Sequence, residues 1–454
     1  METVRGPRGT FLVGHLREFR ADRLAFMTRC AREYGDIVPL KLLGHPVFLL
    51  NRPDLIEQVL VTHTKHFIKH AGLRLYKPIL GNGLVTSEGE FWRRQRKLSA
   101  PAFQASRLPS YAKVMVEATE RMCAAWAESL EKGTLQSRDV NADMMRLTLE
   151  IACRTLFGAT ACPDPDVVGH AMNLGLEGIA ARFRAAVPLP AWLPTPNNLR
   201  VRRSMRSLHA VIAQLIAAHG GTNGNGDADG GDDLLSMLLA ARDEDGSAMS
   251  PNQLLDEVLT IFLAGHETTA LALSYALYLL AGHPAAQDEL RAELARELGG
   301  RPPVFADLPK LVYTRKVVNE AMRLYPPADF LGREAIEDCA VAGIRVRKGT
   351  NLFMSQWVMH RDARYFRDPL TFDPSRWTEE FERSLPRFAY FPFGGGPRYC
   401  IGQTFATAEA ALVLATVCAR FTFAADPTFR LELNPGITLR PKAGVRVRVA
   451  RSDD

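Results

Sequence analysis

The feature that most constrains this chain is a ten-residue string near its C-terminal end, FGGGPRYCIG, residues 393–402. It places Cys400 at the end of a glycine-rich loop, directly before an apolar segment, Phe405 to Ala419, that we interpret as a helix. Backbone N–H groups of the loop and the helix start can stabilise a thiolate. The glycines let backbone pass close to a large flat group. The string therefore indicates a thiolate ligand to haem iron, with a buried structural cysteine as the alternative.

Charge and cysteine content exclude several function classes. The chain has 454 residues, 47% hydrophobic content and a net charge of +6, without the dense basic stripe of a nucleic-acid binder. Its 7 cysteines are scattered with no CxxC pair, so we expect no disulfide framework and a cytoplasmic location. No long apolar run opens the chain, so we expect neither a signal peptide nor a membrane anchor.

The pattern of helices and linkers predicts one domain over residues 1–454, mainly α with a smaller β part, in a monomer. We expect a lead-in over about residues 1–30 and a flexible surface loop over 220–232, where the composition is Gly, Asn and Asp. Residues 111–158 read as one long helix. Strands are predicted over residues 37–50 around a turn at 44–46, and again over 333–346, 349–357 and 437–449.

The longest apolar helical pattern, Pro251 to Gly282, contains AGHETT at residues 264–269. Polar residues inside an apolar helix carry a free-energy cost, and an interior glycine weakens a helix by about 1 kcal/mol relative to alanine. The Thr268 hydroxyl can bond back to the carbonyl of Ala264 or Gly265 and open a groove that suits dioxygen. The alternative is close packing on a neighbouring helix, with Thr268 satisfied by its own backbone.

Charged and aromatic residues in WRRQR, residues 92–96, form a second candidate site. Trp92 and Arg96 lie four apart on one helical face, where an indole N–H and a guanidinium can clamp a carboxylate. Arg93, Arg94 and Lys97 occupy the opposite face, which alone would be read as a solvated basic surface.

Three histidines in THTKHFIKH, at positions 63, 66 and 70, have the spacing of one helical face. A metal site is conceivable there. The glycine at position 72 and the mixed polarity favour solvated loop histidines instead.

The string EAMR places Glu320 and Arg323 three residues apart on a helix, where the two side chains can pair. A buried pair needs a further partner, and Arg376 in FDPSRW is the natural third member. The helix ends at Tyr325-Pro326-Pro327.

Taken together, AGHETT, EAMR, FDPSRW and FGGGPRYCIG occur in an order that resembles the cytochrome P450 family of haem-thiolate monooxygenases, in its soluble bacterial type without a fused reductase. WRRQR is similar to the Trp-and-Arg helix of that family. The resemblance covers about residue 30 to the end. It implies the cytochrome P450 fold, with a long central helix over haem b and a thiolate ligand loop. We call residues 393–402 the thiolate loop.

The resemblance also implies a role for individual residues. Cys400 would be the axial ligand with Phe393 beside it, Thr268 and Glu267 would relay protons to bound dioxygen, and Ala264 would contact the haem. The implied propionate partners are Trp92, Arg96, Arg333 and Arg398, and the implied structural triad is Glu320, Arg323 and Arg376.

The implied reaction inserts one oxygen atom from O2 into a C–H bond, or adds it to a C=C bond, of a hydrophobic substrate. Electrons from NAD(P)H would arrive through a separate ferredoxin or flavodoxin and its reductase, because residues 403–454 are too few for a reductase domain. The hypothesis for docking is the surface of Arg93, Arg94 and Lys97, which would take an acidic partner.

A fatty acid, a terpene and a steroid all suit the apolar pocket that the resemblance implies. The candidate lining residues are Phe67, Leu73, Leu75, Phe262, Phe330, Leu331 and Ile437. Arg74 and Tyr76 could anchor a carboxylate, or simply be solvated. A peroxide-using haem-thiolate peroxygenase and a haem sensor without catalysis are the alternative functions, and Thr268 with Glu267 argues against both.

Overall fold

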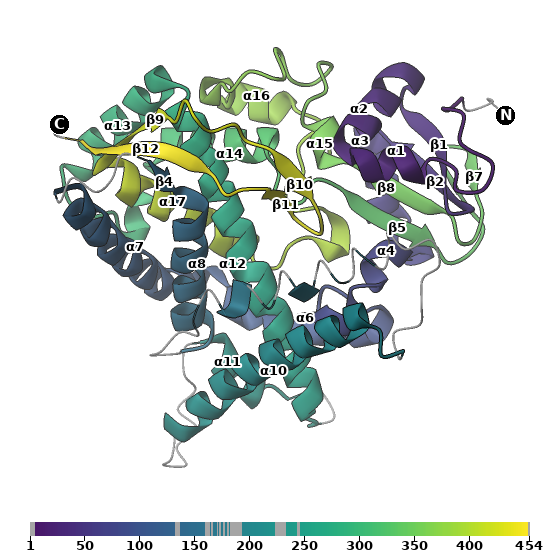
Figure 1. The fold of residues 1–454 in the computed structure, drawn as a ribbon, viewed down its shortest axis with the longest axis horizontal. Coiled ribbons are helices and arrows are strands. Elements are labelled where there is room, and N and C mark those ends of the chain that lie inside the picture. The colour runs from purple at the N-terminus through teal and green to yellow at the C-terminus, as the bar shows by residue number, and fades with distance from the viewer. Residues whose placement is uncertain are drawn as a thin grey trace. The chain divides into compact units, whose positions relative to one another are not determined.

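The structure of the chain is a computed structural model (Figure 1). It describes residues 5–131, 137–158, 164, 167–169, 171, 174–175, 178, 181, 193–222, 233–242 and 246–452. The chain divides into two compact units. The first comprises residues 1–70, 119–144 and 268–454, and the second comprises residues 71–118 and 145–267. The expected lead-in over residues 1–30 already contains α1 (Leu16–Ala21) and most of α2 (Arg23–Tyr34).

The first unit holds every assigned strand of the described residues in four sheets. A five-stranded sheet has the order β1-β2-β8-β5-β3, in which only β2 and β8 are parallel neighbours. Its strands are β1 (Ile37–Leu42), β2 (His45–Leu50), β3 (Phe67–Lys69), β5 (Leu331–Ala335) and β8 (Asn351–Met354). The smaller sheets contain β4 (Arg138–Asp139), β6 (Cys339–Val341), β7 (Ile344–Val346), β9 (Phe421–Ala425), β10 (Leu433–Pro435), β11 (Leu439–Pro441) and β12 (Arg446–Arg451).

The turn between β1 and β2 lies one residue earlier than predicted. Leu43 and Gly44 both have positive φ, 50° and 83°, which is the backbone of a tight two-residue hairpin turn. His45 and Pro46 therefore belong to β2, where Pro46 pairs with Lys41.

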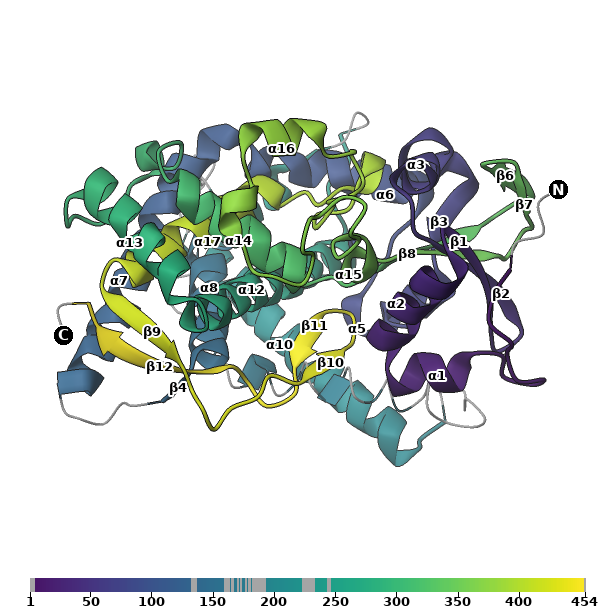
Figure 2. The same cartoon turned by 90° about the horizontal axis from the view of Figure 1, so that it is seen from above.

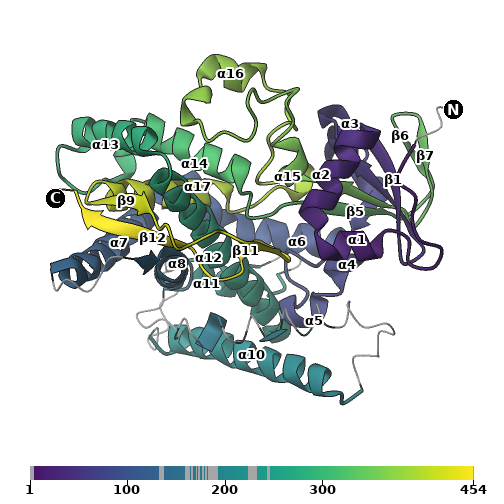
Figure 3. The same cartoon turned by 45° about the horizontal axis from the view of Figure 1, so that its top comes forward.

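Three helices of the first unit, α13, α14 and α17, pack on one another (Figure 3). The helices that lie wholly in this unit are α1, α2, α3 (Pro53–Glu57), α13 (Pro284–Leu298), α14 (Val312–Leu324), α15 (Gln356–Met359), α16 (Glu379–Ser384) and α17 (Gln403–Cys418). α17 is buried from Ala408 to its end at Cys418. Its alanine-rich, apolar sequence predicts such a buried helix. α14 ends at Leu324, directly before Tyr325-Pro326-Pro327.

The second unit holds α4 (Ala71–Arg74), α5 (Lys77–Leu80), α6 (Gly89–Ser99), α10 (Pro196–Thr222) and α11 (Leu234–Ala240). α7 (Leu108–Glu131), α8 (Val140–Leu156) and α12 (Pro251–Ala281) begin in one unit and end in the other. The prediction of one helix over residues 111–158 is thus wrong, because α7 ends at Glu131 and α8 begins at Val140 after the short strand β4. Of the loop predicted over 220–232, residues 220–222 end α10 and the rest lies outside the described residues.

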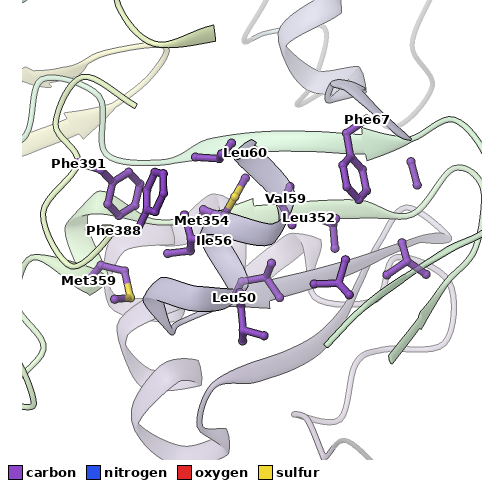
Figure 4. Close-up of a cluster of buried hydrophobic side chains, with 14 residues drawn as sticks. Leu50, Ile56, Val59, Leu60, Phe67, Leu352, Met354, Met359, Phe388 and Phe391 are labelled. Carbon is purple, nitrogen blue, oxygen red and sulfur yellow. The ribbon is translucent and has the colours of Figure 1, made fainter. Parts of the chain in front are cut away.

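The core beneath the thiolate loop is a hydrophobic cluster within the first unit (Figure 4). Phe388 and Phe391, which directly precede the loop, pack there with residues of the five-stranded sheet and of the π-helical turn Gln58–Thr62. The labelled members are Leu50, Ile56, Val59, Leu60, Phe67, Leu352, Met354, Met359, Phe388 and Phe391. No helix of the described residues is long and apolar enough to cross a membrane.

Candidate active site

The thiolate loop is fixed by its own backbone hydrogen bonds. The N–H of Gly394 donates to the carbonyl of Phe391 at 2.9 Å, and the N–H of Cys400 donates to the carbonyl of Phe393 at 3.0 Å. A short 3-10 turn, Gly396–Arg398, precedes the cysteine, and α17 begins at Gln403 with Gly402 as its N-cap. Cys400 thus stands three residues before a helix N-terminus, where the helix dipole favours a negative sulfur.

Two glycines of this loop are required by its path. Gly394 and Gly396 have φ values of 72° and 66°, in the left-handed region that residues with a Cβ rarely adopt. A Cβ on Gly396 would also lie 1.8 Å from the carbonyl oxygen of Leu60. Gly395 is extended, but a Cβ there would meet the Phe388 ring at 2.3 Å. The loop therefore lies directly against the core turn that contains Leu60.

Cys400 differs from the other described cysteines in accessibility. Cys400 is exposed and Cys339 is partly buried, whereas Cys30, Cys123, Cys153 and Cys418 are buried. Burial raises the pKa of the Cys30 thiol to about 11 and that of Cys123 to about 12, so these thiols stay neutral. The position and accessibility of Cys400 fit a sulfur that binds iron.

The central helix α12 has an accessible patch in its middle. Ala264 is exposed, and Gly265 and Thr268 are half-buried, while most of their neighbours from Leu254 to Leu280 are buried. Residues 264, 265 and 268 share one helical face, since they are one turn apart. Helix α12 therefore presents a small-residue surface with one hydroxyl, at the place where the sequence predicts a dioxygen groove. Glu267, next to Thr268, is 4% exposed.

Behind this patch, His266 points into the protein. The His266 Nδ1 lies 2.7 Å from the carbonyl oxygen of Phe262, and the backbone carbonyl of His266 accepts a hydrogen bond of 2.9 Å from the Thr148 hydroxyl. The Phe262 ring is fully buried against Phe157 and the imidazole of His266. These contacts all lie within the second unit, and they hold α12 on α8 just before Thr268.

Glu320, Arg323 and Arg376 meet in a buried network. The carboxylate of Glu320 accepts two hydrogen bonds of 2.8 Å from Arg323 and one of 2.9 Å from Arg376. It also accepts from the indole of Trp377 at 2.9 Å and from the backbone N–H of Asp373 at 3.0 Å. Trp377 and Asp373 lie within the string FDPSRW, for which the sequence predicted a role at Arg376 alone. Nothing in their spacing from Glu320 predicts these bonds.

His360 links this network to the thiolate loop, and the sequence reasoning missed it. Arg323 donates to the His360 carbonyl at 2.8 Å, and the His360 Nε2 accepts the N–H of Phe391 at 3.0 Å. Burial, aided by Arg361 and Arg323, holds the pKa of His360 well below 6.5, so the imidazole is neutral and can accept this bond. The carbonyl of Phe391 in turn receives the N–H of Gly394.

The predicted propionate partners lie in different parts of the chain. Trp92 is buried and Arg96 half-buried on α6, in the second unit. Arg333 on β5 is 8% exposed and donates to the Gly332 carbonyl at 3.0 Å, and Arg398 is half-buried in the turn before Cys400. All four side chains are hydrogen-bond donors of the kind that haem propionates accept.

The predicted pocket residues are placed unevenly. Leu331 lies beside the thiolate loop, because its Cδ1 would be 3.4 Å from a Cβ on Gly394. Phe330 packs on Phe353 and His70, and Ile437 is half-buried between β10 and β11. Phe67 belongs to the hydrophobic core cluster, Leu73 is half-buried, and Leu75 is 49% exposed.

The histidine cluster does not form a metal site within the described residues. The Nδ1 of His66 lies 2.5 Å from the Glu337 carboxylate. His70 packs instead on Phe330 and Phe353, with its ring against Gly332. The prediction of solvated loop histidines therefore needs a correction at His70, which is half-buried because its ring packs on two aromatic side chains.

Comparison with known proteins adds to this geometry. The sequence model of the cytochrome P450 family matches residues 4–445. The chain is 36% identical over 437 residues to cyclooctatin synthase of Streptomyces melanosporofaciens, covering 96% of this chain and 91% of that protein. It is 33% identical over 439 residues to cyclooctat-9-en-7-ol 5-monooxygenase of the same organism, with the same coverage. It is 34% identical over 441 residues to pentalenene oxygenase of Streptomyces avermitilis, covering 96% and 93%.

Proposed function

The chain belongs to the cytochrome P450 family and is a monooxygenase with haem b as its cofactor, and we propose that it oxidises a terpenoid with electrons from a separate redox partner. The relatives named as a monooxygenase and an oxygenase do not favour a peroxygenase or a sensor. The observation that carries the assignment of the site is the accessible thiol of Cys400 on a loop in which Gly395 and Gly396 leave no room for a Cβ.

The residues of the thiolate loop fit the haem group. Cys400 would hold the iron, and Arg333 and Arg398 of the first unit would neutralise propionates. Trp92 and Arg96 stay propionate partners that only the family resemblance predicts. When bound, haem supplies the iron at which one atom of dioxygen is activated for transfer to the substrate. Hydrogen bonds connect Glu320 through Arg323 and His360 to the backbone of Phe391, directly before the thiolate loop. These bonds would fix where the loop lies relative to α14, and with it the position of the Cys400 sulfur.

On α12, the half-buried Thr268 would hold a proton-donating water at its hydroxyl, and Glu267 would supply the proton. Ala264 and Gly265 leave space on the same helical face, so a small molecule can approach the backbone there. The Thr268 hydroxyl, one helical turn from this space, is placed to transfer a proton to a molecule bound there. A larger side chain at Ala264 or Gly265 would fill the space.

A terpenoid is favoured over the other hydrophobic candidates by the relatives. Cyclooctat-9-en-7-ol 5-monooxygenase is named for an alcohol with one double bond and pentalenene oxygenase for an alkene, and neither name contains a carboxylate. The residues that line the turn nearest the thiolate loop, Phe330 and Leu331, are apolar. A terpenoid without a carboxylate does not need Arg74 and Tyr76 to bind it, whereas a fatty acid would need such partners for its carboxylate.

Electrons would come from a ferredoxin or flavodoxin and its NAD(P)H reductase. The candidate docking surface on α6 has exposed Arg93 and Lys97 and a half-buried Arg94. Arg93 forms an ion pair with Glu90, and Arg94 donates to the Ser247 hydroxyl at 3.0 Å. Reversing Lys97 to Glu should slow reduction by an acidic partner and reduce its dependence on salt. An unchanged rate at low salt would remove this surface from docking.

A reduced carbon-monoxide difference spectrum tests the assignment of the ligand. The wild-type protein should show the red-shifted Soret band of a thiolate-bound haem, and Cys400→Ser should lose it. Cys339→Ser is the matched control, because Cys339 is a partly buried thiol outside the loop and should leave the band intact. Loss of the band in the control alone would overturn the assignment.

Spectral titration tests the substrate class. Terpenoid alkenes and alcohols should shift the Soret band of the haem-loaded protein on binding, and turnover should add one oxygen atom to the substrate, detected by mass spectrometry. Fatty acids and steroids of equal size are the comparison. Binding of fatty acids only would refute the terpenoid proposal while leaving the monooxygenase in place.

A further inference from the structure

Arg23, the first residue of α2, joins three distant segments of the first unit. Its Nε and Nη2 donate to the two carboxylate oxygens of Asp329 at 2.9 and 2.5 Å, and Nη2 also donates to the Gly436 carbonyl at 2.8 Å. Its guanidinium carbon lies 4.8 Å from the centre of the Phe330 ring. The start of α2 and the β10–β11 hairpin are seen in Figure 2. One side chain thus holds residues 306 and 413 positions away.

The pair is shielded from water. The Asp329 side chain is 0% exposed and that of Arg23 is 13% exposed, so Coulomb attraction is weakly screened here. Arg23 also stands at the positive end of a helix dipole, which disfavours a cation. The stability of α2 therefore does not explain an arginine at this position. The two parallel hydrogen bonds from its guanidinium to the Asp329 carboxylate do explain it, because only an arginine can form both.

Both segments that Arg23 holds are tied to each other as well. The N–H of Leu439 donates to the Pro327 carbonyl at 2.8 Å, and the N–H of Gly436 donates to the Thr438 carbonyl at 2.9 Å. The backbone carbonyl of Asp329 accepts from the Ser355 hydroxyl and from the Trp357 N–H. Residues 327–331 and 436–439 therefore form one hydrogen-bonded platform, which we call the Arg23 platform.

We propose that Arg23 is a positioning residue for substrate specificity, which sets the relative placement of the 327–331 turn and the 436–439 turn through Asp329 and the Gly436 carbonyl. The inference rests on the proposed function and on the prediction that Phe330, Leu331 and Ile437 line the substrate pocket. Leu331 already lies against the thiolate loop at Gly394. A shift of the platform would move these apolar side chains relative to the sulfur of Cys400.

A buried ion pair alone does not explain the arrangement. Replacing both members of such a pair with apolar residues is often neutral for stability, whereas removing one member is costly. What apolar residues cannot replace is the third bond, from Arg23 to the Gly436 carbonyl. The double variant Arg23→Met/Asp329→Leu should therefore fold well and still lose the placement of the 436–439 turn.

Amide hydrogen exchange of the haem-loaded protein tests the platform without substrate. In Arg23→Lys, which keeps the charge but loses the fork, exchange at the amides of Gly436 and Leu439 should accelerate about tenfold, since a hydrogen bond to a charged group is lost. The amide of Phe391, bonded to His360, is the internal reference. The matched variant is Arg29→Lys on the same helix, whose partner Glu18 is 47% exposed, and it should change neither amide.

Ligand binding tests the consequence for specificity. The ratio of dissociation constants for imidazole and 4-phenylimidazole, measured from the Soret shift, should change by about tenfold in Arg23→Lys and in the double variant, but not in Arg29→Lys. 4-Phenylimidazole carries an additional phenyl ring, so its binding should depend more than that of imidazole on where apolar side chains such as Leu331 lie. If terpenoids bind, the ratio of oxidised products should change in the same variants.

The outcomes separate this inference from the proposed function. If no terpenoid binds the wild type, the proposed substrate is wrong, and the imidazole ratio and amide exchange still decide the role of Arg23. If the double variant regains wild-type ligand ratios along with its stability, Arg23 has a purely structural role and the inference is overturned. Equal exchange rates at Gly436 in all variants would overturn it as well.

Discussion

The indole Nε1 of Trp377 donates a hydrogen bond of 2.9 Å to Oε2 of Glu320, a carboxylate that is completely buried. Glu320 thereby accepts five N–H donors on two oxygens, from Arg323, Arg376, Trp377 and the backbone of Asp373. A buried carboxylate is tolerated only when its acceptor capacity is filled and an opposite charge is near. Without the indole, Oε2 of Glu320 would accept a hydrogen bond from Arg323 alone, so Trp377 supplies the second donor to that oxygen.

Removing the Trp377 donor and removing the Glu320 charge should have effects of different size. Trp377→Phe removes one neutral donor and should lower the free energy of unfolding by about 1–2 kcal/mol while the thiolate Soret band persists. Glu320→Gln leaves the fully buried Arg323 without a counter-charge and should cost about 3–5 kcal/mol, with loss of haem. Chemical denaturation followed by fluorescence and the Soret band measures both. A Glu320→Gln protein as stable as Trp377→Phe would contradict the role given to the buried charge.

The two left-handed glycines of the thiolate loop should respond differently to alanine. Gly394→Ala should cost about 1–2 kcal/mol, because its added Cβ meets Leu331 at an ordinary contact distance of 3.4 Å and only the backbone is strained. Gly396→Ala must displace the backbone at Leu60 and should abolish haem binding in the reduced carbon-monoxide spectrum. Retention of the full band in Gly396→Ala would mean that the loop can move away from Leu60.

Thr268 and Thr269 are adjacent on α12, so they form a matched pair. Thr268→Ala should keep the thiolate Soret band but divert electrons from NAD(P)H to hydrogen peroxide, because the hydroxyl on the accessible face is lost. Thr269 is 3% exposed and faces Glu409, so Thr269→Ala should keep its coupling. The measurement is product and peroxide formed per NAD(P)H consumed. Equal coupling in both variants would remove Thr268 from proton delivery.

Glu409 on α17 should make stability depend on pH. Burial raises its pKa to about 8, with the Thr269 hydroxyl acting in the opposite direction, against 4.5 for an ordinary glutamate. The folded protein therefore keeps a proton that the unfolded chain releases above pH 4.5. The contribution of Glu409 is fully present below pH 4.5 and falls by about 4–5 kcal/mol as pH rises to 8.

Unfolding of the wild type and of Glu409→Gln between pH 4.5 and 8 checks this sign. The variant should gain stability relative to the wild type as pH rises. Asp426→Asn is the control of opposite sign, because hydrogen bonds from Ser137 and Thr428 lower the pKa of Asp426 to about 2. The difference in stability between Asp426→Asn and the wild type should stay constant between pH 4.5 and 8, and it should shrink only when the measurement is extended below about pH 4. Parallel profiles for wild type and Glu409→Gln would show that Glu409 is ionised in the fold.

Local patterns were enough to find most of the elements around the site. Residues 405–419 and 251–282 have the composition and periodicity of buried helices, and the structure contains α17 and α12 there. The hairpin of β1 and β2 was also predictable, apart from its turn. Leu43 takes a positive φ that its residue type disfavours, so the position of the turn was set by strand pairing and not by local preference.

Other features depend on contacts between distant residues, which no local pattern records. The break between α7 and α8 is placed by β4, which pairs with β12 some 300 residues later in the chain. His360 accepts a backbone N–H and links Glu320 to the loop, yet an isolated histidine carries no such signal. The same holds for Arg23, which reads as an ordinary helix residue.

The sequence by itself determined the family of this protein, because the glycines and the cysteine that predict a thiolate ligand are contiguous from Phe393 to Gly402 and need no tertiary contact to be recognised. Only the tertiary structure decided which side chains hold that loop and the neighbouring turns. Glu320 with Trp377, His360 with Phe391, and Arg23 with Asp329 are each joined across tens to hundreds of residues. Buried polar groups must find partners, and the partner is selected by the packing of the whole unit.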